Sequence, residues 1–364
     1  MRVLHVVTLL SSYGAYGGPA RVAVNQAEAL VRRGHSVTIA AAGSGDWPTS
    51  GGVIYRCFAP RTLLPGTGFA GLAAPSMVRW AMNSLVDFDV VHIHLSRDLV
   101  TLPMATLARF RRLPYVTQTH GMVDESEHRL AGPIDAVATR AALRAASSVF
   151  YLTEREREDL LLVARQPVQL HELTNSVPIL PARDSPDRLE VLFLARLHPR
   201  KRVDMFVDMA DVLLHEHDSV TFALVGPDEG DGASVVSRQG PRLQWEGALD
   251  PSLTAERMAS ASIYVLPSMD EPYPMSVLEA MATGLPVVIS DSCGLASAVT
   301  RLRCGIVIPA GDLRALVDAV RTLLKDDALR IEMGRRGREG ARAEFGTEAI
   351  AEQLEGHYES AIEG

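Results

Sequence analysis

Hydrophobic positions along this chain follow two alternating patterns. Short continuous apolar runs, typical of strands buried in a parallel sheet, are followed by segments in which apolar residues return every three or four positions, which is typical of helices. The alternation runs through the first half of the chain and begins again near residue 190. Strands are predicted at residues 3–8, 37–41, 53–58, 90–94, 115–119 and 148–152, and then at 190–195, 220–225, 242–246, 263–266, 287–289 and 305–308.

This order of elements predicts an α/β fold with two doubly wound domains. A polar connector containing Pro178, Pro181 and Pro186 separates the halves and is the predicted hinge. We place the domains at residues 1–182 and 186–345, and predict that the chain ends in helices at 312–325, 328–344 and 347–362. Residues 61–81, rich in glycine and proline, are predicted to form a long connection.

The stretch from Ser262 to Asp291 predicts a strand, a loop, a helix and a second strand. Pro274 stands near the start of the helix and Gly284 at its end, which are the usual positions for these residues. Glu271 lies just before the helix and Glu279 lies within it. The free N–H groups of a helix N-terminus bind phosphate, so the stretch suits a phosphorylated ligand with hydroxyl groups on both sides. An exposed loop glutamate and a helix-surface glutamate are the simpler interpretation of the two carboxylates alone.

Other polar motifs also follow predicted strands. Gly17 and Gly18 come after the first strand, without the G-x-G-x-x-G spacing of dinucleotide-binding domains. His120 follows the strand at 115–119, and Thr153 with Glu156 predicts a capping box after the strand at 148–152. In the second half the strand-end residues are Arg196, Lys201, Gly226 and Gly247. Because side chains at the carboxyl ends of parallel strands face the ligand crevice, these positions are candidate site residues. A lone histidine or a basic loop can equally be structural or simply solvated.

Composition narrows the class of protein. The 364 residues are 47% hydrophobic and 22% charged, and 36 basic against 44 acidic residues give a net charge of −8. This balance does not predict nucleic-acid binding. Three cysteines without metal-type spacing predict a reducing compartment, and no apolar run is long enough to span a membrane, so we expect a cytoplasmic protein.

The string E-P-Y-P-M-S-V-L-E-A-M-A-T-G-L-P-V-V, which begins at Glu271, closely resembles the signature of retaining GT-B glycosyltransferases of family 4, with seven residues between its two glutamates. The resemblance implies two Rossmann-like domains facing each other across a cleft, with the last helix, 346–364, packing back toward the first domain. It implies transfer of a sugar from a UDP- or GDP-sugar to an acceptor hydroxyl with retention of configuration. The segment R-L-x-x-x-K from Arg196 to Lys201 resembles the diphosphate-binding pair of the family, with Ala195 where glycine is common.

The resemblance assigns roles to the candidate residues. The catalytic residues would be His120, Arg196, Lys201 and Glu271. The donor would contact two glycines of the first domain and a larger set in the second, namely Gly17, Gly18, Gly226, Gly247, Pro274, Met275, Ser276, Val277 and Glu279. The acceptor side would hold Arg21, Met122 and Asp124. We expect both Arg196 and Lys201 to lie in a surface loop.

No cofactor and no metal are expected, because the chain has no Asp-x-Asp motif and fixed cations can neutralise the diphosphate. The acceptor can be a carbohydrate, a lipid-linked sugar or a small molecule. An apolar cluster in the first domain, Leu63, Leu64, Phe69 and Leu72, is interpreted either as core or as an acceptor or membrane contact, and nearby arginines permit docking on an anionic leaflet. The oligomeric state is not predicted.

Two other functions remain open at this stage. A sugar-nucleotide epimerase of the same fold would turn over the donor without an acceptor. A non-catalytic sugar-nucleotide-binding protein would bind the donor without hydrolysing or transferring it.

Overall fold

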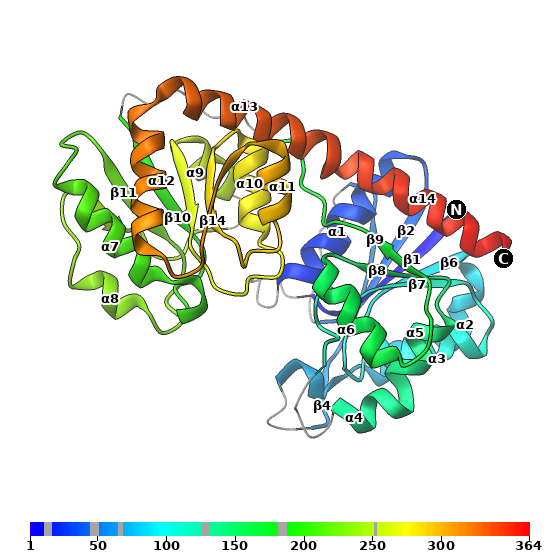
Figure 1. Ribbon diagram of the computed structural model, residues 1–364. Helices are drawn as coiled ribbons and strands as arrows, with labels where there is room; N and C mark the ends of the chain where they lie inside the picture. The colour runs from blue at the N-terminus through cyan, green and yellow to red at the C-terminus, as the bar shows by residue number, and fades with distance from the viewer. Residues whose placement is uncertain (11–16, 44–50, 65–67, 126–130, 181–187, 251–252) are drawn as a thin grey trace. The chain divides into compact units, whose positions relative to one another are not determined.

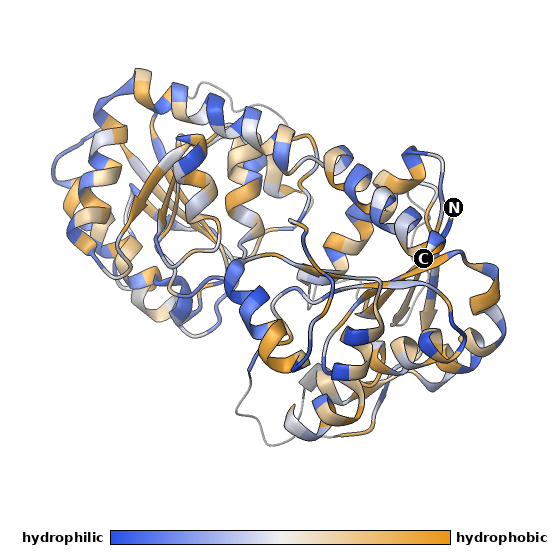
Figure 2. Cartoon of the chain, turned by 45° about the vertical axis from the view of Figure 1, so that its right-hand side comes forward, coloured by the Kyte–Doolittle hydropathy of each residue, from blue (hydrophilic) through white to orange (hydrophobic). Residues whose placement is uncertain are grey.

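A computed structural model describes residues 1–10, 17–43, 51–64, 68–125, 131–180, 188–250 and 253–364 (Figure 1). The chain forms two α/β units. The first contains Met1–Ser176 together with Thr347–Gly364, and the second contains Val177–Gly346. Figure 2 shows that the strands of both units are largely apolar, as expected for sheets covered on both faces.

The first unit is built on a seven-stranded sheet in the order β3-β2-β1-β6-β7-β8-β9. Every neighbouring pair in it is parallel. The strands are β1 (Arg2–Leu9), β2 (Ser36–Ala42), β3 (Ile54–Phe58), β6 (Val90–His94), β7 (Tyr115–Gln118), β8 (Ser148–Tyr151) and β9 (Leu170–Glu172). A separate two-stranded pair is formed by β4 (Arg61–Thr62) and β5 (Leu72–Ala73).

Helices cover both faces of this sheet. One face packs on α1 (Gly17–Arg32) and α14 (Thr347–Glu363). The other packs on α2 (Pro75–Ser84), α3 (Thr101–Phe110), α5 (Arg140–Ala145) and α6 (Glu154–Ala164), and the short α4 (Ala131–Ile134) leads through a π-helical turn into α5. The last helix is held beside α1 by polar contacts, in which Glu355 accepts from Arg33 and lies 2.7 Å from His35.

The second unit has a six-stranded parallel sheet in the order β12-β11-β10-β13-β14-β15. Its strands are β10 (Glu190–Leu194), β11 (Thr221–Val225), β12 (Leu243–Trp245), β13 (Ile263–Leu266), β14 (Val287–Ser290) and β15 (Gly305–Ile308). Its helices are α7 (Val203–Leu214), α8 (Gly232–Val236), α9 (Thr254–Ala259), α10 (Met275–Thr283), α11 (Ala296–Leu302), α12 (Leu313–Lys325) and α13 (Asp327–Glu344). The α/β class and the two doubly wound sheets are confirmed.

The boundary between the units lies earlier than the predicted hinge. Val177 donates its N–H to the carbonyl of Phe345 at 2.7 Å, and Arg338 donates to the carbonyl of Leu180 at 3.1 Å. These contacts attach the first part of the connector to the second unit, so the division falls after Ser176 instead of at residue 182. Residues 181–187, which include most of the predicted hinge, lie outside the described residues.

Several short elements differ from the sequence prediction. The connection at 61–81 contains β4, β5 and the start of α2, and the helices α4, α5, α8 and α11 were not predicted. These elements are two to ten residues long, which is too short for a periodic apolar pattern to stand out. The predicted cap at Gly284 is confirmed, since its φ of 92° is the left-handed conformation that glycine adopts easily.

Three glycines spaced by three residues let α13 lie against the elements beside it. A Cβ added to Gly334 would stand 2.1 Å from the carbonyl oxygen of Gly284 at the end of α10, and one added to Gly340 would stand 2.6 Å from the side chain of Leu302. Gly337 faces Met281 and Cys304. The missing side chains therefore allow the backbones of α10 and α13 to approach closely.

Gly334→Ala should destabilise the second unit, because the new methyl group meets backbone that cannot move without separating α10 and α13. We expect a loss of about 1–3 kcal/mol, measured as the shift in midpoint of urea unfolding. Gly356→Ala is the matched control, since Gly356 also lies within a helix but has nothing within 4 Å of an added Cβ. The control should gain up to about 1 kcal/mol from helix propensity. Equal effects of the two substitutions would contradict this account of the packing.

Candidate functional site

The second sheet reverses its strand order between β10 and β13. From β10 the chain moves outward to β11 and β12, then returns to place β13 on the other side of β10. At such a switch point the loops that leave the two strands diverge and open a crevice at their carboxyl ends, where ligands bind in doubly wound folds. The loop after β10 carries Arg196 and Lys201, and the loop after β13 carries Glu271. The topology therefore brings together three of the four predicted catalytic residues.

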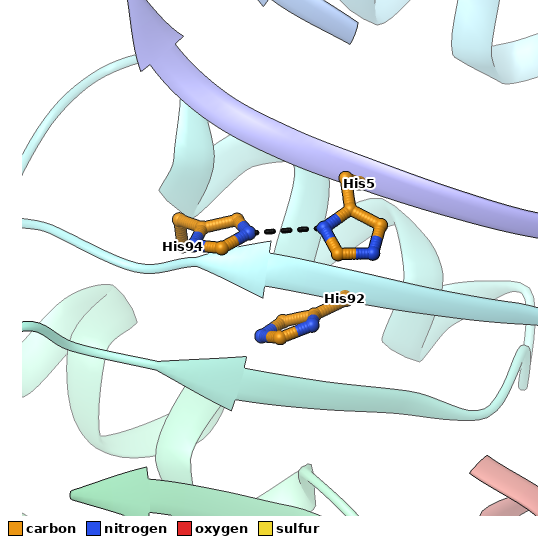
Figure 3. Close-up of side chains that lie close together, drawn as sticks. All are labelled: His5, His92 and His94. Atoms are coloured by element: carbon orange, nitrogen blue, oxygen red, sulfur yellow. Dashed lines mark hydrogen bonds between the residues drawn. The ribbon is translucent and has the colours of Figure 1, made fainter. Parts of the chain in front are cut away.

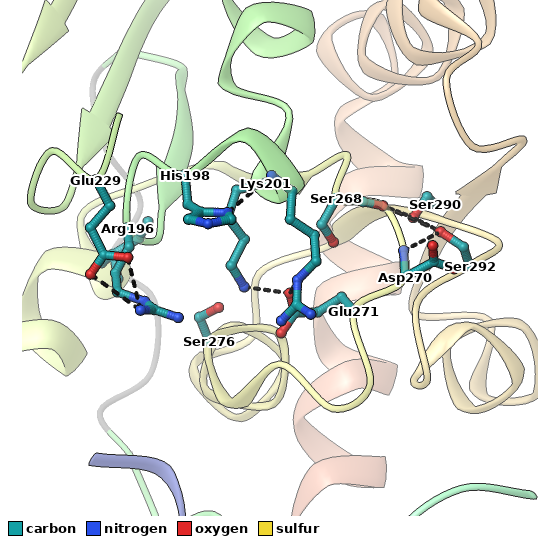
Figure 4. Close-up of polar contacts among 12 residues, drawn as sticks. Arg196, His198, Lys201, Glu229, Ser268, Asp270, Glu271, Ser276, Ser290 and Ser292 are labelled. Atoms are coloured by element: carbon teal, nitrogen blue, oxygen red, sulfur yellow. Dashed lines mark hydrogen bonds and ion pairs between the residues drawn. The ribbon is translucent and has the colours of Figure 1, made fainter. Parts of the chain in front are cut away.

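Lys201 and Glu271 form a buried ion pair. Lys201 Nζ donates to Glu271 Oε2 at 2.6 Å, and the two residues are 8% and 7% exposed (Figure 4). Arg200 Nε lies 3.8 Å from the same carboxylate oxygen. Backbone bonds fix both loops, since Met269 donates to the carbonyl of Arg200 at 2.8 Å and Gly294 donates to that of Glu271 at 2.9 Å. The expectation that Lys201 lies in a surface loop is therefore wrong, because its side chain turns inward to neutralise Glu271.

Arg196, in contrast, is exposed. Its guanidinium donates to Glu229 at 2.9 Å and 3.1 Å, and in Figure 4 this pair lies on the opposite side of Ser276 from Glu271. An exposed pair of this kind is held weakly. The side chain of Arg196 can therefore leave Glu229 for another anion at little cost.

The helix α10 begins beside these cations. Its N-cap is Pro274, which provides no side-chain hydrogen bond to the first turn. Met275 and Ser276 are half-buried, and Ser276 Oγ is held 2.7 Å from the hydroxyl of Tyr264 on β13. Val277 and Glu279 are buried in the following turn. The uncapped first turn offers N–H groups and the positive end of the helix dipole to an anion.

Two glycine turns shape the loops after β11 and β12. Gly226 has a φ of 147°, and a Cβ there would stand 1.9 Å from the carbonyl oxygen of Ala195, so only glycine fits beside β10. Gly247, with a φ of 79°, accepts the N–H of Gly226 at 2.8 Å. Asp228 accepts from the N–H groups of Gly230 and Gly232 at 2.9 Å, and these bonds lower the pKa of its carboxyl. The predicted Gly226 and Gly247 therefore lie on adjoining strand-end loops.

In the first unit His120 is held in a strained turn after β7. Its φ is 53°, an uncommon conformation for a residue with a side chain. The carboxylate of Glu156 accepts from the hydroxyl of Thr119 and from the N–H of Gly121, both at 2.5 Å, and from the N–H of Leu152 at 2.7 Å. Thr153 does cap α6, but Glu156 does not complete a capping box, because its side chain holds the His120 loop instead.

The His120 ring contacts another histidine, which the sequence analysis did not select. His120 Nε2 lies 2.8 Å from Nδ1 of His94, and the planes of the two rings, whose centroids are 5.1 Å apart, differ by 7°. Burial lowers the pKa of His120 to about 3. A side-chain interaction with Asn175 acts in the opposite direction but is the smaller effect. The ring is therefore neutral near pH 7. The alternation V-V-H-I-H at residues 90–94 places His92 and His94 on one face of β6 and could have indicated this cluster.

The other residues predicted in the first unit differ in accessibility. Asp124 is exposed and pairs with Arg97 at 3.1 Å, while Met122 is half-buried. Gly17 and Gly18 form the first turn of α1, and Arg21 is exposed on the same helix. Leu63 and Leu64 are exposed and Leu72 is half-buried, whereas the side chain of Phe69 lies outside the described residues.

An apolar groove of about 560 Å³ lies on the first unit between α2, α3, α4 and the π-helical turn that follows α4. Its walls are almost entirely apolar, and Phe110 and Val137 at its edge are 78% and 82% exposed. It is distinct from the predicted cluster around Leu63. Among the described residues, no helix is long and apolar enough to cross a membrane.

Comparisons with known proteins agree with this architecture. The model for "Glycosyl transferases group 1" matches residues 188–326, and that for "Glycosyl transferase 4-like domain" matches residues 17–176. The chain is similar to an alpha-D-kanosaminyltransferase of Streptomyces kanamyceticus, with 26% identity over 69% of this chain and 72% of that protein. It is 33% identical to a phosphatidyl-myo-inositol mannosyltransferase of Mycobacterium leprae over 47% of this chain and 46% of that protein. The structure of Anabaena Alr3699/HepE in complex with UDP has a TM-score of 0.78 at 19% identity, covering 99% of this chain and 100% of that one.

The doubly wound sheets and these matches define the chain as a glycosyltransferase of the GT-B fold. It belongs to the group 1 glycosyl transferases, the family 4 type. The resemblance first seen in the string around Glu271 is thereby confirmed. The role of each site residue stays a prediction.

Substitution of the two cations should separate stability from activity. Lys201→Met leaves the buried Glu271 with the longer contact of 3.8 Å to the exposed Arg200 in place of Lys201, so the second unit should lose up to about 3–5 kcal/mol in urea unfolding. Arg196→Met should unfold like the wild type, because its ion pair is exposed. Both variants should lose about 10²-fold or more in kcat/KM for sugar transfer.

The double variant Lys201→Met/Glu271→Gln is the control for the unpaired charge. It should regain most of the lost stability without regaining activity. A stable and fully active Lys201→Met protein would show that the pair serves neither purpose.

Proposed function

We propose that this protein transfers a sugar from a nucleoside-diphosphate sugar to an acceptor hydroxyl with retention of anomeric configuration. The observation that supports this most is the grouping at the carboxyl ends of β10 and β13. There the buried Lys201–Glu271 pair, the exposed Arg196 and the uncapped N-terminus of α10 lie within one unit. The grouping offers positive charge to a diphosphate and a carboxylate to hydroxyl groups.

The residues have distinct proposed roles in the reaction. The diphosphate gains negative charge as the bond to the sugar breaks, so cations fixed beforehand stabilise the transition state more than the ground state. Lys201 is such a cation, because Glu271 already orients it. Arg196 would move from Glu229 to the phosphates, and α10 would donate N–H groups through Met275 and Ser276, while the N–H of Val277 donates to the carbonyl of Pro274 at 3.1 Å. The departing phosphate would help to remove the proton of the acceptor hydroxyl, and no enzyme nucleophile is proposed.

The remaining residues would bind the two ends of the donor. Glu271 would accept hydrogen bonds from sugar hydroxyls, and Glu279 from the ribose. The turns at Gly226 and Gly247 would present backbone groups to the base. Gly17, Gly18 and His120 are proposed as donor contacts from the first unit, with Arg21, Met122 and Asp124 toward the acceptor.

UDP is the nucleotide we favour, because several structurally similar proteins were solved with it, including Anabaena Alr3699/HepE in complex with UDP and glucose. The relatives named above are a kanosaminyltransferase and a mannosyltransferase for phosphatidyl-myo-inositol. We therefore propose a small-molecule, carbohydrate or lipid-linked acceptor. A lipid-linked acceptor or a membrane surface would suit the apolar groove of the first unit.

Transfer should proceed without a divalent metal, since fixed cations stand where a metal would neutralise the diphosphate. We expect release of UDP from one of a panel of UDP-sugars. An excess of EDTA, about 5–10 equivalents, should leave the rate of release unchanged. Loss of activity with EDTA that Mn²⁺ or Mg²⁺ restores would contradict metal independence but leave the transferase assignment intact.

Turnover of the donor to an epimer without any acceptor would favour the epimerase alternative. Donor binding with neither hydrolysis nor transfer would favour a non-catalytic sugar-nucleotide-binding protein.

The two glutamates should fail in different ways. Glu279→Gln should weaken the binding of both UDP and the UDP-sugar by roughly tenfold, because a charged hydrogen bond to the ribose is lost. Glu271→Gln should leave UDP binding at or above the wild-type level, since Lys201 is released toward the diphosphate, while transfer falls sharply. Calorimetric titration with UDP, together with turnover of the donor, measures both effects. Equal weakening of bare UDP by the two substitutions would refute this division of roles.

A further inference from the structure

Four histidines and one tyrosine form a continuous polar chain inside the first unit. His92 Nδ1 lies 2.7 Å from the hydroxyl of Tyr358, which lies 3.4 Å from His5 Nε2. His5 Nδ1 lies 3.1 Å from His94 Nε2, and His94 Nδ1 lies 2.8 Å from His120 Nε2. Figure 3 shows the contact between His5 and His94, with His92 beside them. The chain leads from the C-terminal helix α14 to the candidate site residue His120.

A metal ion does not explain this cluster. His5, His92 and His94 have ring nitrogens close enough to share an ion. However, the rings of His92 and His94 are stacked, with centroids 4.5 Å apart and 12° between their planes. The lone pair of an imidazole nitrogen lies in the plane of its ring, so two stacked rings cannot direct lone pairs to one point. One nitrogen of His5 and one of His94 are in addition already bonded to each other.

The number of protons restricts this chain to two arrangements. Burial lowers the pKa of all four histidines, of His5 and His120 to about 3, so each ring is neutral and carries one N–H. The chain has five protons, four on the imidazoles and one on the phenol, but it has four contacts. If each contact holds one proton, the fifth lies at one end of the chain. The two ends are His92 Nε2 and His120 Nδ1. Both are buried and make no hydrogen bond of normal geometry among the described residues, although the side chain of Asn175 lies close enough to His120 to raise the pKa of its ring.

The contacts link the four tautomers to one another. When the extra proton is at His92, every ring carries its proton on Nε2. When it is at His120, every ring carries its proton on Nδ1. A mixed arrangement would place two protons, or none, in one of the contacts, unless Tyr358 accepted from both imidazoles and turned its own proton out of the chain, which would leave a buried donor unpaired. The direction of the hydrogen bonds at Tyr358 therefore determines which nitrogen of His120 carries the proton.

The distances around Tyr358 favour the arrangement in which the extra proton is at His92 and every ring carries its proton on Nε2. A hydroxyl donor makes shorter hydrogen bonds than an N–H donor. The short contact of 2.7 Å between Tyr358 and His92 fits donation from the phenol to His92 Nδ1, and the longer contact of 3.4 Å fits donation from His5 Nε2 to the phenol oxygen. The neutral imidazole also prefers the Nε2–H form intrinsically.

We propose that Tyr358, acting through His5 and His94, holds His120 in the tautomer that has its proton on Nε2 and a lone pair on Nδ1. His120 is then a hydrogen-bond acceptor for a substrate hydroxyl and not a donor or an acid. Tyr358, His5 and His94 are positioning residues. The substrate role rests on the proposed function, whereas the tautomer does not.

The tautomers can be observed directly by NMR of the protein with ¹⁵N-labelled histidine, because protonated and bare ring nitrogens resonate far apart. The His120 signals are identified as those lost in His120→Gln. We expect the wild-type ring to carry its proton on Nε2. A wild-type His120 with its proton on Nδ1 would overturn the proposal, and this measurement needs no other variant to fold.

Tyr358→Phe tests the coupling. Without the phenol, the Nε2–H of His5 loses its acceptor, so the shorter chain should shift toward Nδ1–H, with the proton of His120 placed near Asn175. We expect the His120 ring signals to move accordingly, and kcat/KM to fall by about threefold to tenfold. Tyr115→Phe is the matched control, since Tyr115 is buried in the same unit and donates to the carbonyl of Ala142 at 2.6 Å outside the chain. It should leave the His120 tautomer unchanged and activity within about twofold.

The two proposals fail separately. A tautomer that shifts in Tyr358→Phe but not in Tyr115→Phe supports the chain even if no donor is ever turned over. A tautomer that is the same in all three proteins overturns the chain, whatever the activity of the enzyme.

Discussion

The ion pair between Lys201 and Glu271 is the constraint on which the second unit's site depends. Both groups are nearly excluded from water, so neither charge can remain there without the other. The pair joins the loop after β10 to the loop after β13, and these are the strands between which the sheet reverses its order. Ligands of doubly wound folds bind where the strand order reverses, and the pair fixes two charged side chains at that place. Arg196 pairs with Glu229 at the surface and can move, whereas Lys201 is held in place by the buried Glu271.

On the sheet face that α1 and α14 cover, the first unit buries uncharged polar groups, whereas its buried acidic residues Asp98, Asp135 and Glu156 belong to other parts of the unit. Its histidines, with the glutamines Gln26 and Gln118, lie on the sheet face that α1 and α14 cover, and each is neutral or hydrogen-bonded. This arrangement requires the last helix, because the hydroxyl of Tyr358 satisfies two of the imidazoles. It gives a physical reason for the path of the chain, in which α14 packs in the first unit although it follows the second in sequence. The polar contacts of Glu355 with Arg33 and His35 hold the helix in the same place.

Long elements and strand-end motifs were predictable from sequence, whereas contacts between distant segments were not. The strands at 90–94, 263–266 and 305–308 have the predicted bounds, because each is a continuous apolar run between loop residues. The burial of Lys201 could not be foreseen, since nothing in a basic loop reveals that a carboxylate seventy residues away will need it. For the same reason Glu156 looked like half of a capping box until its three partners around His120 were known. The histidine chain was missed because its members lie on four different elements.

The Lys201–Glu271 pair and the histidine chain are thus two different ways of burying polar groups. A charged pair suits a ligand that brings charge, because a diphosphate can replace one partner electrostatically while the other stays in position. A neutral chain suits a ligand that brings hydroxyl groups, because it fixes a donor or an acceptor without creating a charge that the ligand would have to neutralise. A sugar nucleotide carries both kinds of group. The ionic site after β10 and β13 therefore suits a charged part of a ligand, and the neutral site at His120 suits a part that carries hydroxyl groups.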